Sequence, residues 1–206
     1  MDKLPGKTVE RLSEYRRVLL GYHEGGNDYI FSHELAALLH ITAVQVRRDL
    51  MLIGYSSVMK KGYDIKELIS TIGEIIDYDR GLNVAVIGLG HFGKAISAYF
   101  RGKRSKLNIV AAFDIDKDLV GKENAGVMCY DISAMEEIIK EKDVSIAILT
   151  VPPEFASQIA ENVISCGIKG ILNFTTVPLR MPSNVYLEEY DMITSIEKLA
   201  YFVKEG

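Results

Sequence analysis

The 206-residue sequence has no tryptophan, only two cysteines and five prolines, and no long apolar run. A membrane-spanning helix needs about 20 mostly apolar residues, so the sequence predicts no membrane partner. Residues 1–6 lack the apolar stretch of a signal peptide, and we expect a cytoplasmic protein. Cys129 and Cys166 stand apart, without the spacing of a metal site or redox motif. They predict two small buried side chains and no metal centre.

Neither sign of charge dominates, because 24 Lys and Arg stand against 28 Asp and Glu, for a formal net charge of -4. That balance excludes a chain that coats nucleic acid through bulk positive charge. The content of 48% apolar and 25% charged residues predicts a folded chain of one large domain or two smaller ones. Residues 1–63 carry a slight excess of basic residues, which permits DNA binding there without demonstrating it.

Residues 1–80 show helical periodicity and little strand character. Leu12, Tyr15 and Leu19 recur at the spacing of one helical face, and Thr8 is a candidate N-cap for that helix. The expected helices lie at about residues 9–22, 33–39, 43–50 and 65–80. The second and third of these form a helix-turn-helix, an arrangement that many DNA-binding domains use.

The third expected helix carries side chains that reach bases and phosphates. Thr42 and Gln45 fit a capping box at its start, in which each side chain satisfies one exposed N–H group. The apolar residues of the helix face inward, which leaves Gln45 and Arg48 on the outer face and Arg47 beside it. A solvated basic surface is the simpler interpretation, and a DNA-reading helix is the alternative that we favour.

A short β-wing is expected at residues 58–63, where two adjacent lysines would contact the DNA backbone. This basic wing beside the third helix is the reason for favouring a DNA-reading helix over a solvated basic surface. The residues expected to contact DNA are Thr42, Gln45, Arg47, Arg48, Lys60 and Lys61.

After residue 81 the apolar residues form continuous runs, which are typical of parallel strands buried on both faces. The runs are Val84–Ile87, Ile109–Phe113, Ile146–Leu149 and Gly170–Phe174, with helices expected at 93–101, 133–141 and 153–165. This alternation predicts an α/β fold with a Rossmann-like, doubly wound parallel sheet. A last helix is expected from Asp191 to Glu205, with an apolar side formed by Met192, Ile196, Leu199 and Val203.

The segment Gly88-Leu89-Gly90-His91-Phe92-Gly93 follows the first of these strands and opens a helix. Its glycines allow a tight turn, close approach of a pyrophosphate and close helix–strand packing. Asp114 ends the next strand, where an acid that binds the ribose belongs, and favours NAD over NADP; Asp116 is the alternative. Thr150-Val151-Pro152 follows the run Ile146–Leu149, at the edge where such sheets bind ligands, although Pro153 also suits the start of a helix.

Together these segments resemble the Rex family of bacterial redox-sensing transcriptional repressors, over essentially the whole chain. The resemblance is carried by Thr42–Leu50, the glycine segment, Leu149–Pro152 and Gly167–Phe174, in this order and spacing. It implies a homodimer with an N-terminal winged helix-turn-helix domain, a Rossmann domain and a C-terminal helix swapped between subunits. It also implies that NAD permits binding to double-stranded operator DNA and that NADH releases it.

The resemblance assigns roles to three further residues. Arg17 and Asp191 match an arginine of the first helix and an aspartate before the last helix, and they imply an ion pair between subunits that forms in one cofactor state. Tyr99 matches a tyrosine near the nicotinamide. His91-Phe92 departs from the polar-then-aliphatic pair of the family, so the contacts of that pair are not carried over. The domains expected are 1–80, 81–190 and 191–206.

Two other functions share parts of this pattern. An NAD-dependent oxidoreductase would use the same sheet, but residues 175–206 are too few for the substrate domain that such enzymes usually carry. A nucleotide- or CoA-binding subunit also shares the sheet but leaves the helix-turn-helix unexplained. The sequence therefore favours a repressor with no catalytic activity.

Overall fold

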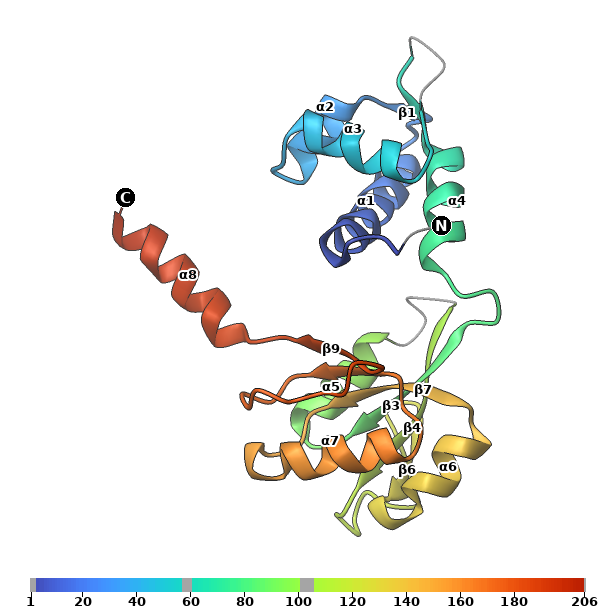
Figure 1. The fold of residues 1–206 in the computed structure, drawn as a ribbon, viewed down its shortest axis with the longest axis vertical. Helices are drawn as coiled ribbons and strands as arrows, with labels where there is room; N and C mark the ends of the chain where they lie inside the picture. The colour runs from blue at the N-terminus through green and yellow to red at the C-terminus, as the bar shows by residue number, and fades with distance from the viewer. Residues whose placement is uncertain (1–2, 57–60, 101–105, 206) are drawn as a thin grey trace. The chain divides into compact units, whose positions relative to one another are not determined.

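The computed structural model describes residues 3–56, 61–100 and 106–205, and its contacts divide the chain into two compact units, Met1–Tyr78 and Asp79–Gly206 (Figure 1). The division falls two residues before the boundary expected after residue 80. The last helix belongs to the second unit by its contacts.

The first unit is a helical domain with one small antiparallel sheet. Its elements are α1 (Gly6–Glu24), β1 (Tyr29–Ile30), α2 (Ser32–Leu38), α3 (Ala43–Leu52), β2 (Tyr63–Asp64) and α4 (Ile65–Ile76). The helices pack around one apolar cluster that includes Leu12, Leu19, Val46 and Leu68, all fully buried. The four expected helices are therefore present, although α4 ends at Ile76 and not at the expected residue 80.

One further detail of this unit differs from expectation, and another is described only in part. Helix α1 begins at Gly6, so the assignment of Thr8 as its N-cap is wrong. Thr8 is buried within the helix, and its hydroxyl accepts a hydrogen bond from Arg11 at 3.3 Å. Strand β2 pairs with β1, but residues 57–60, which include half of the expected wing and Lys60, lie outside the described residues.

The second unit contains a seven-stranded sheet in the order β5-β6-β4-β3-β7-β8-β9. The strands are β3 (Leu82–Ile87), β4 (Leu107–Asp114), β5 (Glu123–Asn124), β6 (Val127–Asp131), β7 (Val144–Leu149), β8 (Gly170–Asn173) and β9 (Tyr186–Glu189). All neighbouring pairs are parallel except β5 with β6. Without the edge strand β5, this is the order of a dinucleotide-binding Rossmann sheet, with its topological switch point between β3 and β7.

Helices cover both faces of this sheet. They are α5 (His91–Phe100), α6 (Met135–Glu141) and α7 (Ala156–Ser165), the last two each preceded by a 3-10 turn. Residues of α6 and α7 share an apolar cluster with one face of the strands, and Ile96 of α5 shares a second cluster with the other face. Strands buried on both faces explain the continuous apolar runs.

Helix α8 (Met192–Glu205) carries an uncovered apolar surface. Its exposed apolar side chains are Met192, Ile193, Ile196, Leu199, Tyr201, Phe202 and Val203. Leu199, for example, is 65% exposed. A helix with this much apolar surface in water is typical of an interaction site.

Candidate cofactor and DNA-binding sites

The turn between β3 and α5 depends on two of its three glycines for its own geometry. Gly88 has a φ of +91°, in the left-handed region that favours glycine. A Cβ atom at Gly93 would collide with the carbonyl oxygen of Gly88. These two residues therefore fix the tight turn and the close contact between helix and strand.

Gly90 is different, because neither its backbone nor its surroundings require glycine. It has no positive φ, and a Cβ atom built on it would meet nothing within 4 Å. The open space lies beside the N-terminus of α5, whose N–H groups and dipole favour a phosphate. The turn thus fits a pyrophosphate, which would come close to the backbone at Gly90.

The carboxylate of Asp114 lies directly beside this turn. Its Oδ2 accepts a hydrogen bond from the backbone N–H of Leu89 at 2.6 Å, and its Oδ1 accepts from the N–H groups of Ile115 and Asp116. Asp114 is half-buried at the end of β4, and its Oδ2, which accepts a single bond here, retains capacity for a further hydrogen bond. Asp116 is exposed, and its own carboxylate accepts from the N–H of Asp118. Asp114 is therefore the acid that contacts the glycine turn.

Thr150 joins the end of β7 to the same turn. Its hydroxyl donates a hydrogen bond of 2.6 Å to the carbonyl of Gly88 and lies 3.1 Å from that of Ile87. Val151 is half-buried and Pro152 is exposed just beyond it. The structure thus brings the two loops expected at the cofactor site together across the switch point.

The other residues of the glycine turn differ in accessibility. The side chain of Leu89 is fully buried, so only its backbone faces the site, whereas those of His91 and Phe92 are exposed. The ring of Phe92 packs edge-on against Phe174 at 5.1 Å between centroids, and Phe174 packs against Tyr190 at 5.5 Å. This aromatic row runs from the glycine turn to the residue that precedes Asp191.

Tyr99 lies at the other end of α5 from the glycine turn. It lies eight positions after His91, which corresponds to about 12 Å along the helix axis. Its side chain is 63% exposed, and its ring contacts that of Phe100. The structure therefore does not bring Tyr99 to the turn of its own chain.

The second unit also contains Cys129, which is fully buried in β6. Burial, with the negative charge of Asp114 nearby, raises the pKa of its thiol to about 11. The thiolate form is then scarce at neutral pH, which disfavours redox chemistry at this sulfur. No cluster of three or more potential metal-ligating side chains occurs within the described ranges.

In the first unit, the side chains expected to meet DNA are divided between surface and interior. Arg47 and Arg48 are exposed, and Arg47 donates to the hydroxyl of Ser32 at 3.1 Å. Lys61 is also exposed, with its ammonium 6.0 Å from the ring of Tyr29. Thr42 is exposed and caps α3, because its hydroxyl accepts from the N–H of Gln45 at 3.2 Å.

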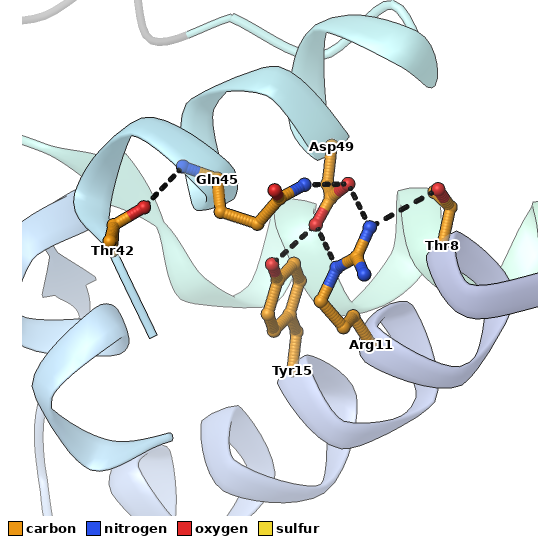
Figure 2. Close-up of polar contacts among 6 residues, drawn as sticks. All are labelled: Thr8, Arg11, Tyr15, Thr42, Gln45 and Asp49. Carbon is orange, nitrogen blue, oxygen red and sulfur yellow. Dashed lines mark hydrogen bonds and ion pairs between the residues drawn. The ribbon is translucent and has the colours of Figure 1, made fainter. Parts of the chain in front are cut away.

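The placement of Gln45 on the outer face is wrong. Its amide is half-buried and donates to Asp49 at 3.0 Å, instead of returning to Thr42 to complete the expected capping box. Figure 2 shows the reason: Asp49 is a buried carboxylate that Arg11, Tyr15 and Gln45 surround with hydrogen-bond donors. A buried charge needs such partners, and Gln45 supplies one of them.

The Asp49 cluster joins α3 to α1. Arg11 donates two hydrogen bonds to the carboxylate, at 2.6 and 2.8 Å, and the Tyr15 hydroxyl donates a third at 2.7 Å. Burial opposes ionisation of Asp49, but the donors outweigh it and hold its pKa below the ordinary value. Burial and the bond to Asp49 raise the pKa of Tyr15. The cluster fixes how α3 is rotated on the domain.

Sequence reasoning missed this cluster. Asp49 lies between Val46 and Leu50 on the inward side of α3, and Tyr15 belongs to the apolar stripe of α1. An acid on an inward-facing helical stripe was the signal that a buried ion pair had to be present.

The two residues of the expected switch lie in different units. Arg17 is exposed on α1. Asp191 precedes α8, where its carboxylate accepts hydrogen bonds from the Thr194 hydroxyl at 2.7 Å and the Ile193 N–H at 2.8 Å, and these bonds lower its pKa. Asp191 thus caps its own helix in this structure.

Two protein-family models match the two units. The model described as "Putative DNA-binding protein N-terminus" matches residues 3–50, and the one described as "CoA binding domain" matches residues 79–177. No helix among the described residues is long and apolar enough to cross a membrane. The fold and these matches define a protein in which a helix-turn-helix DNA-binding domain precedes a Rossmann-like nucleotide-binding domain.

Comparisons over the whole chain identify the family. The redox-sensing transcriptional repressor Rex of Lactobacillus acidophilus is 35% identical over 98% of this chain and 95% of its own length. The Rex repressor of Leuconostoc citreum is 37% identical over 98% of this chain and 93% of its own length. The chain belongs to the Rex family of redox-sensing transcriptional repressors.

Solved structures agree with this assignment. The crystal structure of RSP, a Rex-family repressor, in complex with beta-NAD+ and operator DNA is 30% identical, with a TM-score of 0.89 over 100% of this chain and 94% of that one. RSP in complex with beta-NADH gives a TM-score of 0.87 at 29% identity, over 100% and 96%.

Proposed function

We propose that this chain is a repressor that binds operator DNA as a homodimer with NAD+ bound and leaves the DNA when NADH replaces NAD+. The match to Rex repressors along nearly the whole chain carries this proposal. The relative RSP has been crystallised with beta-NADH, and with beta-NAD+ and operator DNA. An electrophoretic shift on promoter fragments of the source genome, with NAD+ and then with NADH, tests it.

The cofactor site consists of the glycine turn, Asp114 and the loop after β7. Gly88, Gly90, Gly93 and the N-terminus of α5 accept the pyrophosphate, and the backbone of Leu89 and the side chains of His91 and Phe92 lie around it. Asp114 binds the adenosine ribose while it holds the turn through Leu89. The cofactor supplies a nicotinamide ring whose charge differs between its two redox states.

Residues Thr150, Val151 and Pro152 form the opposite wall of this site. The hydrogen bond from Thr150 to Gly88 supports that role, because it ties the two loops into one surface. Tyr99 would approach a nicotinamide only from a neighbouring subunit, since it lies far along α5 from the turn of its own chain.

The homodimer is supported by two incomplete apolar surfaces within the second unit. Helix α8 exposes apolar side chains, and Leu172 and Phe174 are only partly buried on the α5 side of the sheet. An exchanged α8 would cover such a surface in each subunit. Leu199→Asp should give monomers in sedimentation at micromolar concentration, whereas Glu197→Lys on the opposite side of α8 should remain dimeric. A dimeric Leu199→Asp protein would contradict the role of α8.

A binding protein is favoured over an NAD-dependent oxidoreductase or a CoA-binding subunit. The curated relatives are named as repressors, and their similarity extends over both units, whereas the CoA-binding model matches the second unit alone. Turnover of 2-hydroxy acids or aldehydes with NAD(H) by the pure protein would support the enzyme instead.

A further inference from the structure

The outward face of α3 carries an unusual combination of side chains. Val44 is 64% exposed and Met51 is 74% exposed, although both are apolar. The exposed arginines Arg47 and Arg48 lie between them at helical spacings of three and four residues. The face is therefore apolar at each end and cationic in the middle.

The exposed side chains of this face, Val44, Arg47, Arg48 and Met51, include no amide or carboxylate acceptor. The half-buried Gln45 donates its amide N–H to Asp49, which is fully buried (Figure 2). The exposed groups of the face are therefore N–H donors and apolar side chains. In the major groove, donors recognise the O6 and N7 acceptors of guanine, and apolar groups recognise the C5-methyl of thymine.

We propose that Val44 is a specificity-determining residue, which contacts the C5-methyl of a thymine beside the guanine bound by Arg48. The inference rests on the proposed function, in which α3 enters the major groove. Residues 44 and 48 are about 6 Å apart along a helix, which is less than two base-pair steps. The thymine therefore lies within two base pairs of the guanine.

Arg48 is the better candidate for the guanine contact. Arg47 is tied to Ser32 at the start of α2, whereas no hydrogen bond or ion pair holds the Arg48 side chain among the residues that the structure describes. Its guanidinium remains available for a bidentate contact with O6 and N7.

A protein partner fits this face less well than DNA. The two guanidinium groups separate Val44 from Met51, so a partner that covered both would have to desolvate two cations. The major groove supplies acceptors to these cations and methyl groups to the apolar side chains at once.

The test removes one methyl group at a time from the DNA. Operator sites are first selected in vitro with the full-length protein and NAD+. Each thymine is then replaced by deoxyuridine at symmetric positions of both half-sites, and binding is measured by fluorescence anisotropy. Removing a buried methyl corresponds to about a threefold to fivefold loss of affinity per contact.

The expected result is one sensitive thymine per half-site, within two base pairs of a guanine that Arg48→Ala ceases to require. Val44→Ala, which removes both γ-methyl groups of the side chain, should show a smaller difference in affinity between thymine and deoxyuridine operators at that position. Val9→Ala makes the same change on an exposed residue of α1 and should keep the full sensitivity.

Two results would overturn the inference while the proposed function stands: DNA binding insensitive to every deoxyuridine, or equal sensitivity in Val44→Ala and the unmodified protein. Failure of the unmodified protein to select any DNA would instead overturn the proposed function and this inference with it.

Discussion

The carboxylate of Asp114 at the end of β4 accepts a hydrogen bond of 2.6 Å from the backbone N–H of Leu89 in the glycine turn. The residue proposed to bind the ribose therefore also holds the turn proposed to accept the pyrophosphate. On this proposal, ligand binding and loop geometry depend on the same side chain.

The first prediction concerns this double role of Asp114. Asp114→Ala should weaken NADH binding and reduce the ratio of the affinities for NADH and NADPH. The reason is that the acceptor for the ribose hydroxyls and the repulsion of a 2′-phosphate both disappear. Asp114→Asn keeps an acceptor oxygen for Leu89 but removes the charge, and should narrow the preference with a smaller loss of NADH affinity. Calorimetry with both cofactors measures this. If both variants kept the preference of the unmodified protein for NADH over NADPH, another residue, such as Asp116, would bind the ribose.

The second prediction separates base contacts from backbone contacts. Arg48→Ala should lose about 1–3 kcal/mol on the operator and little on unrelated DNA, because a bidentate guanine contact is lost. Lys61→Ala should weaken all sequences alike and reduce the slope of log K against log salt by about 1. Anisotropy titrations at several salt concentrations distinguish the two. An Arg48→Ala protein with unaltered operator affinity would show that α3 does not read the DNA in this way.

The third prediction concerns acid stability. The pKa of Asp49 is lowered in the folded domain, so its contribution to stability is present above the unfolded value of about 3.9 and is lost as the pH falls through the folded value. Asp49→Asn should cost about 2–3 kcal/mol at neutral pH, because Arg11 and Tyr15 lose a charged acceptor. Its unfolding free energy should then vary less with pH below about 4.

Urea unfolding between neutral and acidic pH measures this effect. Glu10→Gln, which changes an exposed carboxylate on α1, is the matched control and should stay within about 0.5 kcal/mol of the unmodified protein. Parallel pH profiles for Asp49→Asn and the unmodified protein would contradict the role of the cluster.

The parts of the fold that could be predicted from the sequence are those that depend on interactions between residues close together in the chain. Strands β3, β4, β7 and β8 and the glycine turn were predictable, because burial on both faces and a turn motif leave local signals. Strand β9 was missed because Tyr186–Glu189 contains little apolar sequence and pairs only at the edge beside β8.

The orientation of Gln45 was not predictable from its own helix. It depends on Asp49, whose partner Arg11 lies 38 residues away in the sequence. Periodicity places a residue on a helical face, but it does not show which tertiary donors a buried carboxylate requires.

The fourth prediction concerns Arg17 and Asp191. Exposed ion pairs contribute about 0–1 kcal/mol, whereas coupling between sites typically needs 1–3 kcal/mol, so a pair that acts as the switch must be partly buried in one state. Arg17→Ala and Asp191→Ala should each reduce the effect of NADH on operator binding, and the double variant should be no worse than either. Operator titrations of the two single variants and the double variant, with and without NADH, provide a double-mutant cycle. Additive losses would mean that the residues act independently, with Asp191 serving only as the cap of α8.

The central claim is that operator DNA and NADH favour different arrangements of the same dimer, and thermodynamic linkage tests it most directly. The measurement is the Kd of NADH with and without saturating operator, followed by the Kd of the operator with and without saturating NADH. The account predicts that each ligand weakens the other by the same factor, about 5-fold to 150-fold for a typical coupling energy. Equal NADH affinity in the presence and absence of operator would contradict it.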